Sequence, residues 1–85
     1  MTFWATITAY CVAGITASGV HTHPGTLAVD PRVIPLGSTV YIRGTAYKAE
    51  DTGPYVHGHH IDAYFTNCAE AKEYGIRRVR VRVTK

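Results

Sequence analysis

The sequence predicts a mainly β fold, a small closed barrel of about six short strands with one short helix. Short runs of alternating apolar and polar residues, separated by glycine and proline, recur along nearly the whole chain. Only residues 67–74 combine helix-favouring residues with suitable ends. With 85 residues, 46% of them hydrophobic and 18% charged, we expect a single domain over 1–85 rather than a disordered chain or a coiled coil.

The first third of the chain predicts two strands joined by a long loop. Residues 2–11 have the period of a half-buried strand, with Phe3, Ala5, Ile7 and Ala9 opposed to Trp4, Thr6, Thr8 and Tyr10. Residues 13–26 are rich in glycine and hydroxyl side chains, which favours a loop with one short extended piece. A short strand is expected at 27–29, because proline at position 31 disfavours helical geometry in Asp30.

The rest of the chain predicts four more strands and the helix. Residues 35–38 form a turn, and strands are expected at 39–43, 46–50 and 60–65. A helix over 67–74 is capped by Thr66 or Asn67, and Gly75 suits its C-terminal end. The last strand, residues 76–83, places Val79, Val81 and Val83 on one face and Arg78, Arg80 and Arg82 on the other.

The basic charge of the chain is local. The net charge is +3, and the last nine positions hold five of the nine Lys and Arg residues, namely Arg77, Arg78, Arg80, Arg82 and Lys85. We interpret this stripe as a solvated outer face; a nucleic-acid surface is the disfavoured alternative, because no aromatic residues are interleaved. No apolar run approaches the roughly 18 residues of a membrane span. We therefore expect a monomer with no nucleic-acid partner and no membrane span.

Cysteines and histidines leave two questions open. Cys11 and Cys68 lie 57 positions apart. They form either one disulfide, which would add about 4 kcal/mol of stability, or two buried thiols. Of the five histidines, His21 and His23 share one strand parity and His57 and His59 another, so convergence on zinc is geometrically possible. Because no Cys-x-x-Cys or His-Glu-x-x-His spacing accompanies them, we expect no metal and no cofactor.

Three aspartates, each in its own local context, carry the most informative pattern. They stand in Ala28-Val29-Asp30-Pro31, Ala49-Glu50-Asp51-Thr52-Gly53 and Ile61-Asp62-Ala63-Tyr64-Phe65. Together with Thr8-Ala9-Tyr10-Cys11, Thr16-Ala17-Ser18-Gly19, the stretch 27–37 and the closing segment 70–78, they resemble the three-aspartate, or 3D, domain family. The resemblance runs from about Ile7 to Val83 in the family's order and spacing.

That resemblance implies a double-psi β-barrel like those of stationary-phase and A-type membrane-bound lytic transglycosylases, and more distantly of expansins. Such enzymes cut bacterial peptidoglycan between N-acetylmuramic acid and N-acetylglucosamine and leave a 1,6-anhydro ring. In this resemblance Asp62 is the catalytic acid and Asp51 lines the same groove, while Thr16 and Ser18 supply donors to the glycan. The alternative for Thr16 and Ser18 is a plain turn without a role in binding. The implied partner is the peptidoglycan glycan strand, and the implied location is extracellular, in the cell wall.

The residues themselves are compatible with that chemistry. Ordinary glycosidases need two carboxylates, but a transglycosylase can use one, which protonates the glycosidic oxygen and then takes the proton of the sugar's own C6 hydroxyl. Asp62 must then stay protonated above the reference aspartate pKa of about 3.9. Desolvation or a nearby like charge would raise its pKa, and Asp51 could supply the charge.

Side-chain alternation predicts which residues share a cleft with Asp62. In an extended segment 60–65, Ile61, Ala63 and Phe65 face the barrel interior, while His60, Asp62 and Tyr64 face outward. We expect Tyr64 to stack on a sugar and His60 to donate a hydrogen bond to it. The residues His57 to His60 stand where the family commonly has a Gly-Asn-Arg-like stretch, which is the main departure from its pattern.

Two further polar residues have a structural and a functional interpretation each. Asp30 precedes a proline in a tight connection, so we expect its carboxylate to bond nearby backbone N–H groups, although its place in the family's motif keeps it a substrate-binding candidate. Lys48 either reaches the groove to bind substrate or solvates an exposed strand.

A second function class remains open beside the enzyme: a non-catalytic, expansin-like module that grips glycan without cutting it. The chain begins without the basic and apolar regions of a signal peptide. We therefore expect either a domain of a longer secreted parent or a protein exported by another route, such as a phage lysis or tail protein.

Overall fold

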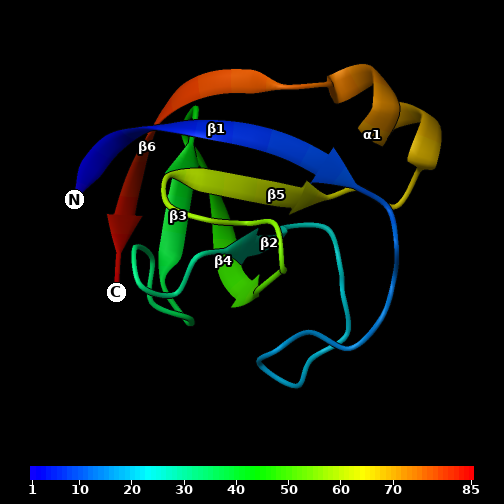
Figure 1. The fold of residues 1–85 in the computed structure, drawn as a ribbon, viewed down its shortest axis with the longest axis horizontal. Coiled ribbons are helices and arrows are strands. Elements are labelled where there is room, and N and C mark those ends of the chain that lie inside the picture. The colour runs from blue at the N-terminus through cyan, green and yellow to red at the C-terminus, as the bar shows by residue number, and fades with distance from the viewer.

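The computed structural model describes residues 1–85 and confirms the predicted fold class, a mainly β, closed six-stranded barrel with one short helix (Figure 1). The strands are β1 (Thr2–Tyr10), β2 (Thr26–Val29), β3 (Thr39–Ile42), β4 (Thr45–Asp51), β5 (His60–Tyr64) and β6 (Arg77–Thr84), and the helix is α1 (Cys68–Tyr74). Every predicted strand and the helix are present, with ends that differ by one residue at most.

Strand pairing around the barrel is mixed and leaves no open edge. The order is β1-β5-β2-β4-β3-β6, with β6 returning to β1. The pairs β1·β5 and β2·β4 are parallel, and the other four pairs are antiparallel. The loop between β1 and β2, seen at the lower right of Figure 1, contains one isolated bridge between Ile15 and His21, as the predicted short extended piece requires.

The core lies inside the barrel and is built from alternate residues of the strands. Ile7, Leu27, Val29 and Ile61 are fully buried, and the three valines of β6 are 5% exposed or less. The predicted division of β6 is confirmed, because its arginines are all exposed. Because side chains alternate along a strand and the inward ones are apolar, the polar residues of β1 and β5 lie on the outer face.

The helix is fastened to the barrel at its first residue. Asn67 is the N-cap, and its side-chain oxygen accepts hydrogen bonds from the backbone N–H groups of Ala69 and Glu70. Of the two alternatives for the cysteines, the structure has the disulfide, which joins Cys68 to Cys11 just after β1. At seven residues, α1 has neither the length nor the apolar character that crossing a membrane demands.

Candidate active site

Asp62 lies at the centre of a row of outward side chains that crosses four strands. It is paired with Thr8 of β1 on one side and with Ala28 of β2 on the other, and Ala28 is paired with Asp51 of β4. Residues paired across a sheet point to the same face, so the row reads Thr8, Asp62, Ala28, Asp51. Neighbouring strands lie about 4.8 Å apart, which separates the backbones of Asp62 and Asp51 by roughly 10 Å.

A β-bulge directs Asp51 to this row. Leu27 pairs with Ala49 in the core, but the next residue of β2, Ala28, pairs with Asp51, so that Glu50 is the extra residue. Without the bulge, simple alternation would point Asp51 to the same side as Ala49, which is completely buried. The register shift therefore brings the second aspartate to the outer face beside Asp62.

The surroundings of Asp62 favour its protonated form. The residue is half-buried, and burial raises the pKa of its carboxyl above the ordinary aspartate value. Two contacts oppose this shift: Thr8 Oγ1 donates a hydrogen bond of 2.9 Å to Asp62 Oδ1, and the charge of His60 acts in the same direction. The raised pKa thus arises from desolvation, whereas the repulsion expected from Asp51 is not among its causes.

Asp51 holds the β1–β2 loop against the barrel. Its Oδ1 atom accepts hydrogen bonds of 2.9 Å from the backbone N–H groups of Ala17 and Thr52. Next to this contact, the N–H of Ser18 donates to the carbonyl of Glu50. The segment that contains Thr16 and Ser18 therefore lies beside the row. Ser18 is exposed, but Thr16 is 4% exposed and its hydroxyl has no protein partner.

His60 and Tyr64 face outward with Asp62, as alternation predicts. His60 Nε2 lies 2.8 Å from Thr8 Oγ1, and Nδ1 lies 3.2 Å from the carbonyl oxygen of Tyr55. Both ring nitrogens thus have partners within the protein, and the expected donation from His60 to a sugar stays a prediction. Tyr64 is half-buried and packs edge-on against Tyr10, with 5.5 Å between ring centroids.

Tyr10 and Thr8 are site residues that the sequence analysis did not single out. The Tyr10 hydroxyl is buried without a hydrogen-bond partner. Burial, followed by the charges of Asp51 and Asp62, raises the pKa of Tyr10 to about 12. Both residues lie in the Thr8-Ala9-Tyr10-Cys11 motif and have the outward parity of β1, and these two signals together could have identified them.

We expect Tyr10→Phe to leave the free energy of unfolding unchanged or slightly raised, because the lost hydroxyl has no internal partner. Thermal denaturation measures the effect, and Tyr41→Phe on β3 is the matched control. A Tyr10→Phe variant that unfolds at a clearly lower temperature than the parent would contradict the absence of an internal partner for this hydroxyl.

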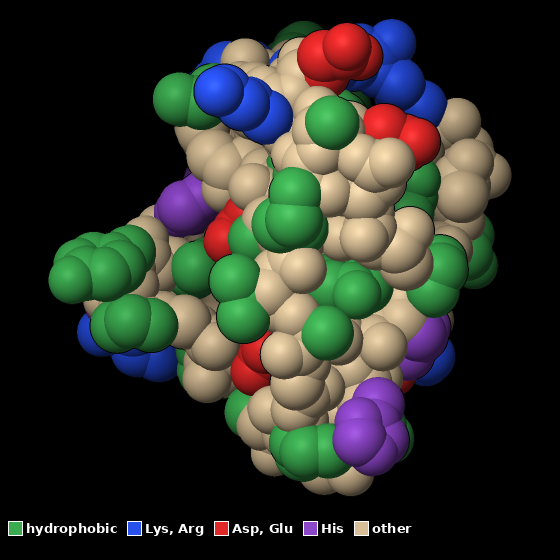
Figure 2. Space-filling view, turned by 90° about the vertical axis from the view of Figure 1, so that its right-hand side faces the viewer, with side chains coloured by type: hydrophobic (Ala, Val, Ile, Leu, Met, Phe, Trp, Pro, Cys, Tyr) green, Lys and Arg blue, Asp and Glu red, His purple; other side chains and the backbone are tan.

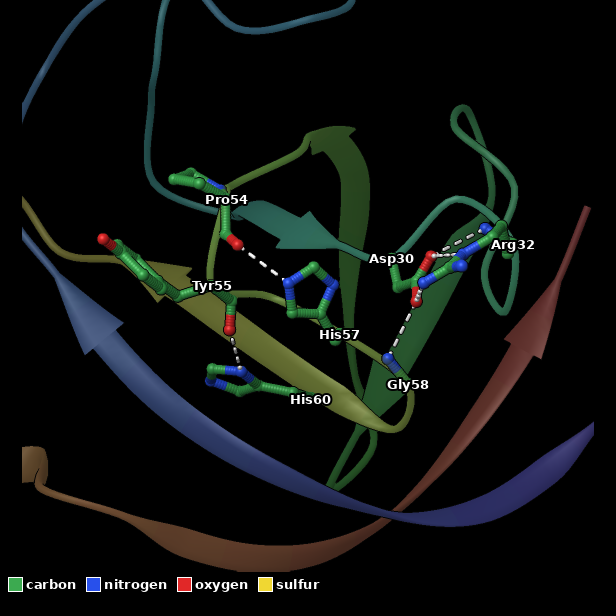
Figure 3. A network of polar contacts seen from close by, with 7 residues as sticks. All are labelled: Asp30, Arg32, Pro54, Tyr55, His57, Gly58 and His60. Carbon is green, nitrogen blue, oxygen red and sulfur yellow. Dashed lines mark hydrogen bonds and ion pairs between the residues drawn. The ribbon is translucent and has the colours of Figure 1, made fainter.

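Asp30 is buried at one end of β2 and fastens the loop that leads into β5 (Figure 3). Its carboxylate accepts from Arg32 Nε, Arg32 Nη2 and the backbone N–H groups of Arg32 and Gly58. The hydrogen bonds from Arg32, followed by that from Gly58, hold its pKa well below the ordinary aspartate value. The expected bonding to backbone N–H groups is present, and these contacts engage both oxygens of the carboxylate.

Lys48, His23, His57 and His59 make side-chain contacts that do not involve Asp62. Lys48 Nζ donates to the carbonyl of Gly37 and to Thr39 Oγ1, which places it on the β3 side of the barrel. The other histidine contacts are separate: His23 pairs with Glu50 at 2.8 Å, His57 bonds the carbonyl of Pro54, and His59 stacks on Phe3. No three His, Cys, Asp or Glu side chains come together as a set of metal ligands.

The arginine stripe of β6 lies outside the barrel, and aromatic residues of neighbouring strands flank it. The Arg82 guanidinium lies 4.2 Å from the ring centroid of Tyr41, and Trp4, 52% exposed, is paired with Arg80. The expectation of an exposed outer face is met. The adjacent aromatics come from β1 and β3, which is why the pattern within 76–83 did not reveal them.

A cavity of about 290 Å³ adjoins the candidate site at the α1 end of the barrel. Its lining includes Tyr47, Phe65 and Tyr74 together with Glu70, and Tyr64 borders both the cavity and the Asp62 face. Figure 2 views the side of the molecule that carries α1: hydrophobic side chains run through the middle of this face, and charged side chains gather at its top. The candidate site is thus bordered by apolar surface on the side of the helix.

Comparisons with known proteins agree on one family. The sequence profile described as 3D domain matches residues 25–85. The chain is 38% identical over 77 residues to "Cell wall-binding protein YocH" of Bacillus subtilis (strain 168), covering 85% of this chain and 27% of that protein. It is 40% identical over 76 residues to "Putative cell wall shaping protein YabE" of the same organism, covering 84% of this chain and 19% of that protein. The chain therefore matches only a small part of each relative.

Proposed function

Because this chain belongs to the 3D domain family, we propose that it acts on bacterial peptidoglycan in the cell wall, as a lytic transglycosylase that cleaves the bond between N-acetylmuramic acid and N-acetylglucosamine. The names of its two relatives, one described as binding the cell wall and the other as shaping it, support the location and the polymer. The observation that carries the reaction is Asp62, a half-buried carboxyl with a raised pKa at the centre of an outward polar row.

Asp62 performs both proton transfers in the proposed reaction. Its carboxyl donates a proton to the glycosidic oxygen, and the bond from that oxygen to the anomeric carbon of N-acetylmuramic acid breaks. The carboxylate then accepts the proton of the C6 hydroxyl of the same sugar, whose oxygen closes on the anomeric carbon to give the 1,6-anhydro ring. Asp62 ends protonated as it began, and no water molecule is consumed.

Asp51 has a supporting role in this proposal. It lies two strands from Asp62, and both of its protein hydrogen bonds end on Oδ1. Its Oδ2 atom therefore has a free face with which to accept from a sugar hydroxyl, while Oδ1 keeps the loop of Thr16 and Ser18 in place as one wall of the site. Tyr64 and Tyr10 supply aromatic surface for a sugar on the opposite side.

A non-catalytic glycan-binding module is the second candidate, and the word "binding" in the name of one relative favours it. Such a module would use the same row and the same aromatic pair. It would need neither the burial of Asp62 nor a protonated carboxyl.

The products distinguish the two functions. Purified peptidoglycan is incubated with the chain, and the soluble fraction is analysed by mass spectrometry. A lytic transglycosylase releases muropeptides with an anhydro end, each lighter by one water than the corresponding hydrolysis product. Sedimentation of the chain with insoluble peptidoglycan and no soluble product would reject catalysis and support the binding module, and hydrolysed ends would reject the ring-closing mechanism.

A further inference from the structure

His60, Thr8 and Asp62 form a continuous chain of hydrogen bonds that ends on the backbone of the loop before β5. Asp62 Oδ1 lies 2.9 Å from Thr8 Oγ1, Thr8 Oγ1 lies 2.8 Å from His60 Nε2, and His60 Nδ1 lies 3.2 Å from the carbonyl oxygen of Tyr55. Figure 3 shows the last of these contacts, with the His60 ring directed at the Tyr55 carbonyl.

The Tyr55 carbonyl determines which nitrogen of His60 carries a hydrogen. A carbonyl oxygen only accepts, so Nδ1 must be the donor in that contact. In a neutral ring, Nε2 is then an acceptor, and it faces the Thr8 hydroxyl. Thr8 has a single hydroxyl hydrogen to give, and it has an acceptor on each side whenever Asp62 is ionised and His60 is neutral.

All three hydrogen bonds can form together only when either Asp62 or His60 carries one additional proton. When Asp62 is ionised, Thr8 donates to it, and Nε2 must carry a hydrogen to donate to Thr8, so His60 is an imidazolium. When His60 is neutral, Thr8 donates to Nε2, and Asp62 must be protonated to donate to Thr8. A neutral His60 beside an ionised Asp62 leaves one of the three contacts unmade.

We propose that His60 and Asp62 share one proton through the Thr8 hydroxyl, with His60 acting as a positioning residue that returns this proton to Asp62. In the transfer, the Oδ–H bond of Asp62 breaks as Thr8 Oγ1 accepts its proton, and the hydrogen of Thr8 moves to His60 Nε2. The reverse transfer restores a protonated Asp62. The net charge of the three residues is the same in both arrangements.

This sharing would let Asp62 act as an acid closer to neutral pH than an isolated aspartate could. Histidine is the side chain that ordinarily changes charge between pH 5 and 8, so a pair that includes it retains a proton further toward neutrality. Thr8 and the charge of His60 by themselves lower the pKa of Asp62, so in this arrangement the proton that the pair retains reaches Asp62 by transfer from His60. The consequence for catalysis rests on the proposed function, whereas the shared proton itself does not.

Other titratable or charged groups around the pair come from β1, β4, β5, β6 and the loop before β5, whereas β2 has none. They are Tyr10 of β1, Tyr64 of β5, Asp51 of β4, Arg78 of β6, and Tyr55, His57 and His59 of the preceding loop. Arg78 Nη1 donates to Thr6 Oγ1, and Thr6 is paired with His60. Asp51 lies on the other side of Ala28. None of these groups has a hydrogen bond to His60 or Asp62 through its side chain.

Titration by NMR tests the shared proton without substrate. The pH dependence of the ring 15N shifts of His60 and the carboxyl 13C shift of Asp62 is measured in the parent, Thr8→Val, Thr8→Ser and His21→Gln. We expect both nuclei of the parent to report the same two midpoints, as coupled groups do. Thr8→Val keeps the β-branched shape without the hydroxyl and should separate them into one step each. Thr8→Ser should retain the shared midpoints, and His21→Gln should change nothing.

Separate single steps in the parent, or a parent-like titration of Thr8→Val, would overturn the inference. In the lyase assay, the alkaline limb of the rate should move to lower pH by roughly one unit or more in Thr8→Val and His60→Gln. Shared midpoints in a chain that makes no anhydro product would reject the proposed function and keep this inference. If the chain makes anhydro product but the alkaline limb of its pH–rate profile stays in place in both variants, the proposed function is kept and this inference is rejected.

Discussion

Asp62→Asn is expected to lower the rate of anhydro-muropeptide release at least about 10³-fold, within the range that a positioned general acid contributes. Asparagine has nearly the same shape, and its side-chain oxygen can still accept the hydrogen bond from Thr8. It has no proton to donate to the glycosidic oxygen. Binding to insoluble peptidoglycan should therefore persist while product formation is lost.

Glu73→Gln is the matched control for this substitution, because it makes the same chemical change at an exposed position of α1. It should keep the parent's rate. An Asp62→Asn chain that still releases anhydro product at more than about a tenth of the parent's rate would contradict the role of Asp62, since a general acid contributes at least about 10²-fold.

Asp62→Asn should lower activity, but it should not lower the stability of the fold. Burial raises the pKa of folded Asp62, so the ionised carboxylate is disfavoured in the folded state. That cost is absent below the unfolded-state pKa of about 3.9, grows as the pH rises above it, and is complete above the raised pKa of the folded protein. Asp62→Asn removes the ionisable group. It should therefore unfold at the same temperature as the parent, or a higher one, at pH 7.

The fold was predictable because short, local sequence patterns determine its strands and its helix. Period-2 alternation in 2–11 and 76–83, and the cap residues around 67–74, place β1, β6 and α1 within one residue of their observed ends. The same alternation correctly placed His60, Asp62 and Tyr64 on the outer face of β5. Local pattern is sufficient there, because no bulge interrupts β5 where it pairs with β1 and β2.

The contacts that define the site depend on residues far apart in the chain, and no local pattern encodes them. Asp51 reaches the outer face through a bulge whose register is set by Ala28 on another strand. His60 contacts Thr8, which lies 52 positions earlier in the chain. Lys48 donates hydrogen bonds to the carbonyl of Gly37 and the hydroxyl of Thr39. In each case the sequence identified the residue as a candidate, but only the structure shows which residue it contacts.

Replacing Cys11 and Cys68 together by serine is expected to lower the free energy of unfolding by about 4 kcal/mol, because the bridge closes a loop of 57 positions in the unfolded chain. Domains of this size have total stabilities of about 5–15 kcal/mol, so the loss is a large fraction of the whole. At roughly 4–8 °C per kcal/mol, the midpoint of thermal unfolding should fall by about 15–30 °C.

The loss should also reach the site, because the bridge ties α1 to the residue that follows Tyr10. Tyr10 packs on Tyr64, which borders the apolar cavity and the Asp62 face, so loosening this end of β1 should weaken glycan binding before the barrel unfolds. Denaturant titration of the parent, the reduced parent and the double variant measures the effect, and intact mass with and without reductant reports the bond itself. The reduced parent should match the double variant. A parent whose unfolding is insensitive to reductant, although its mass shows the bond broken, would show that the barrel does not depend on the bridge.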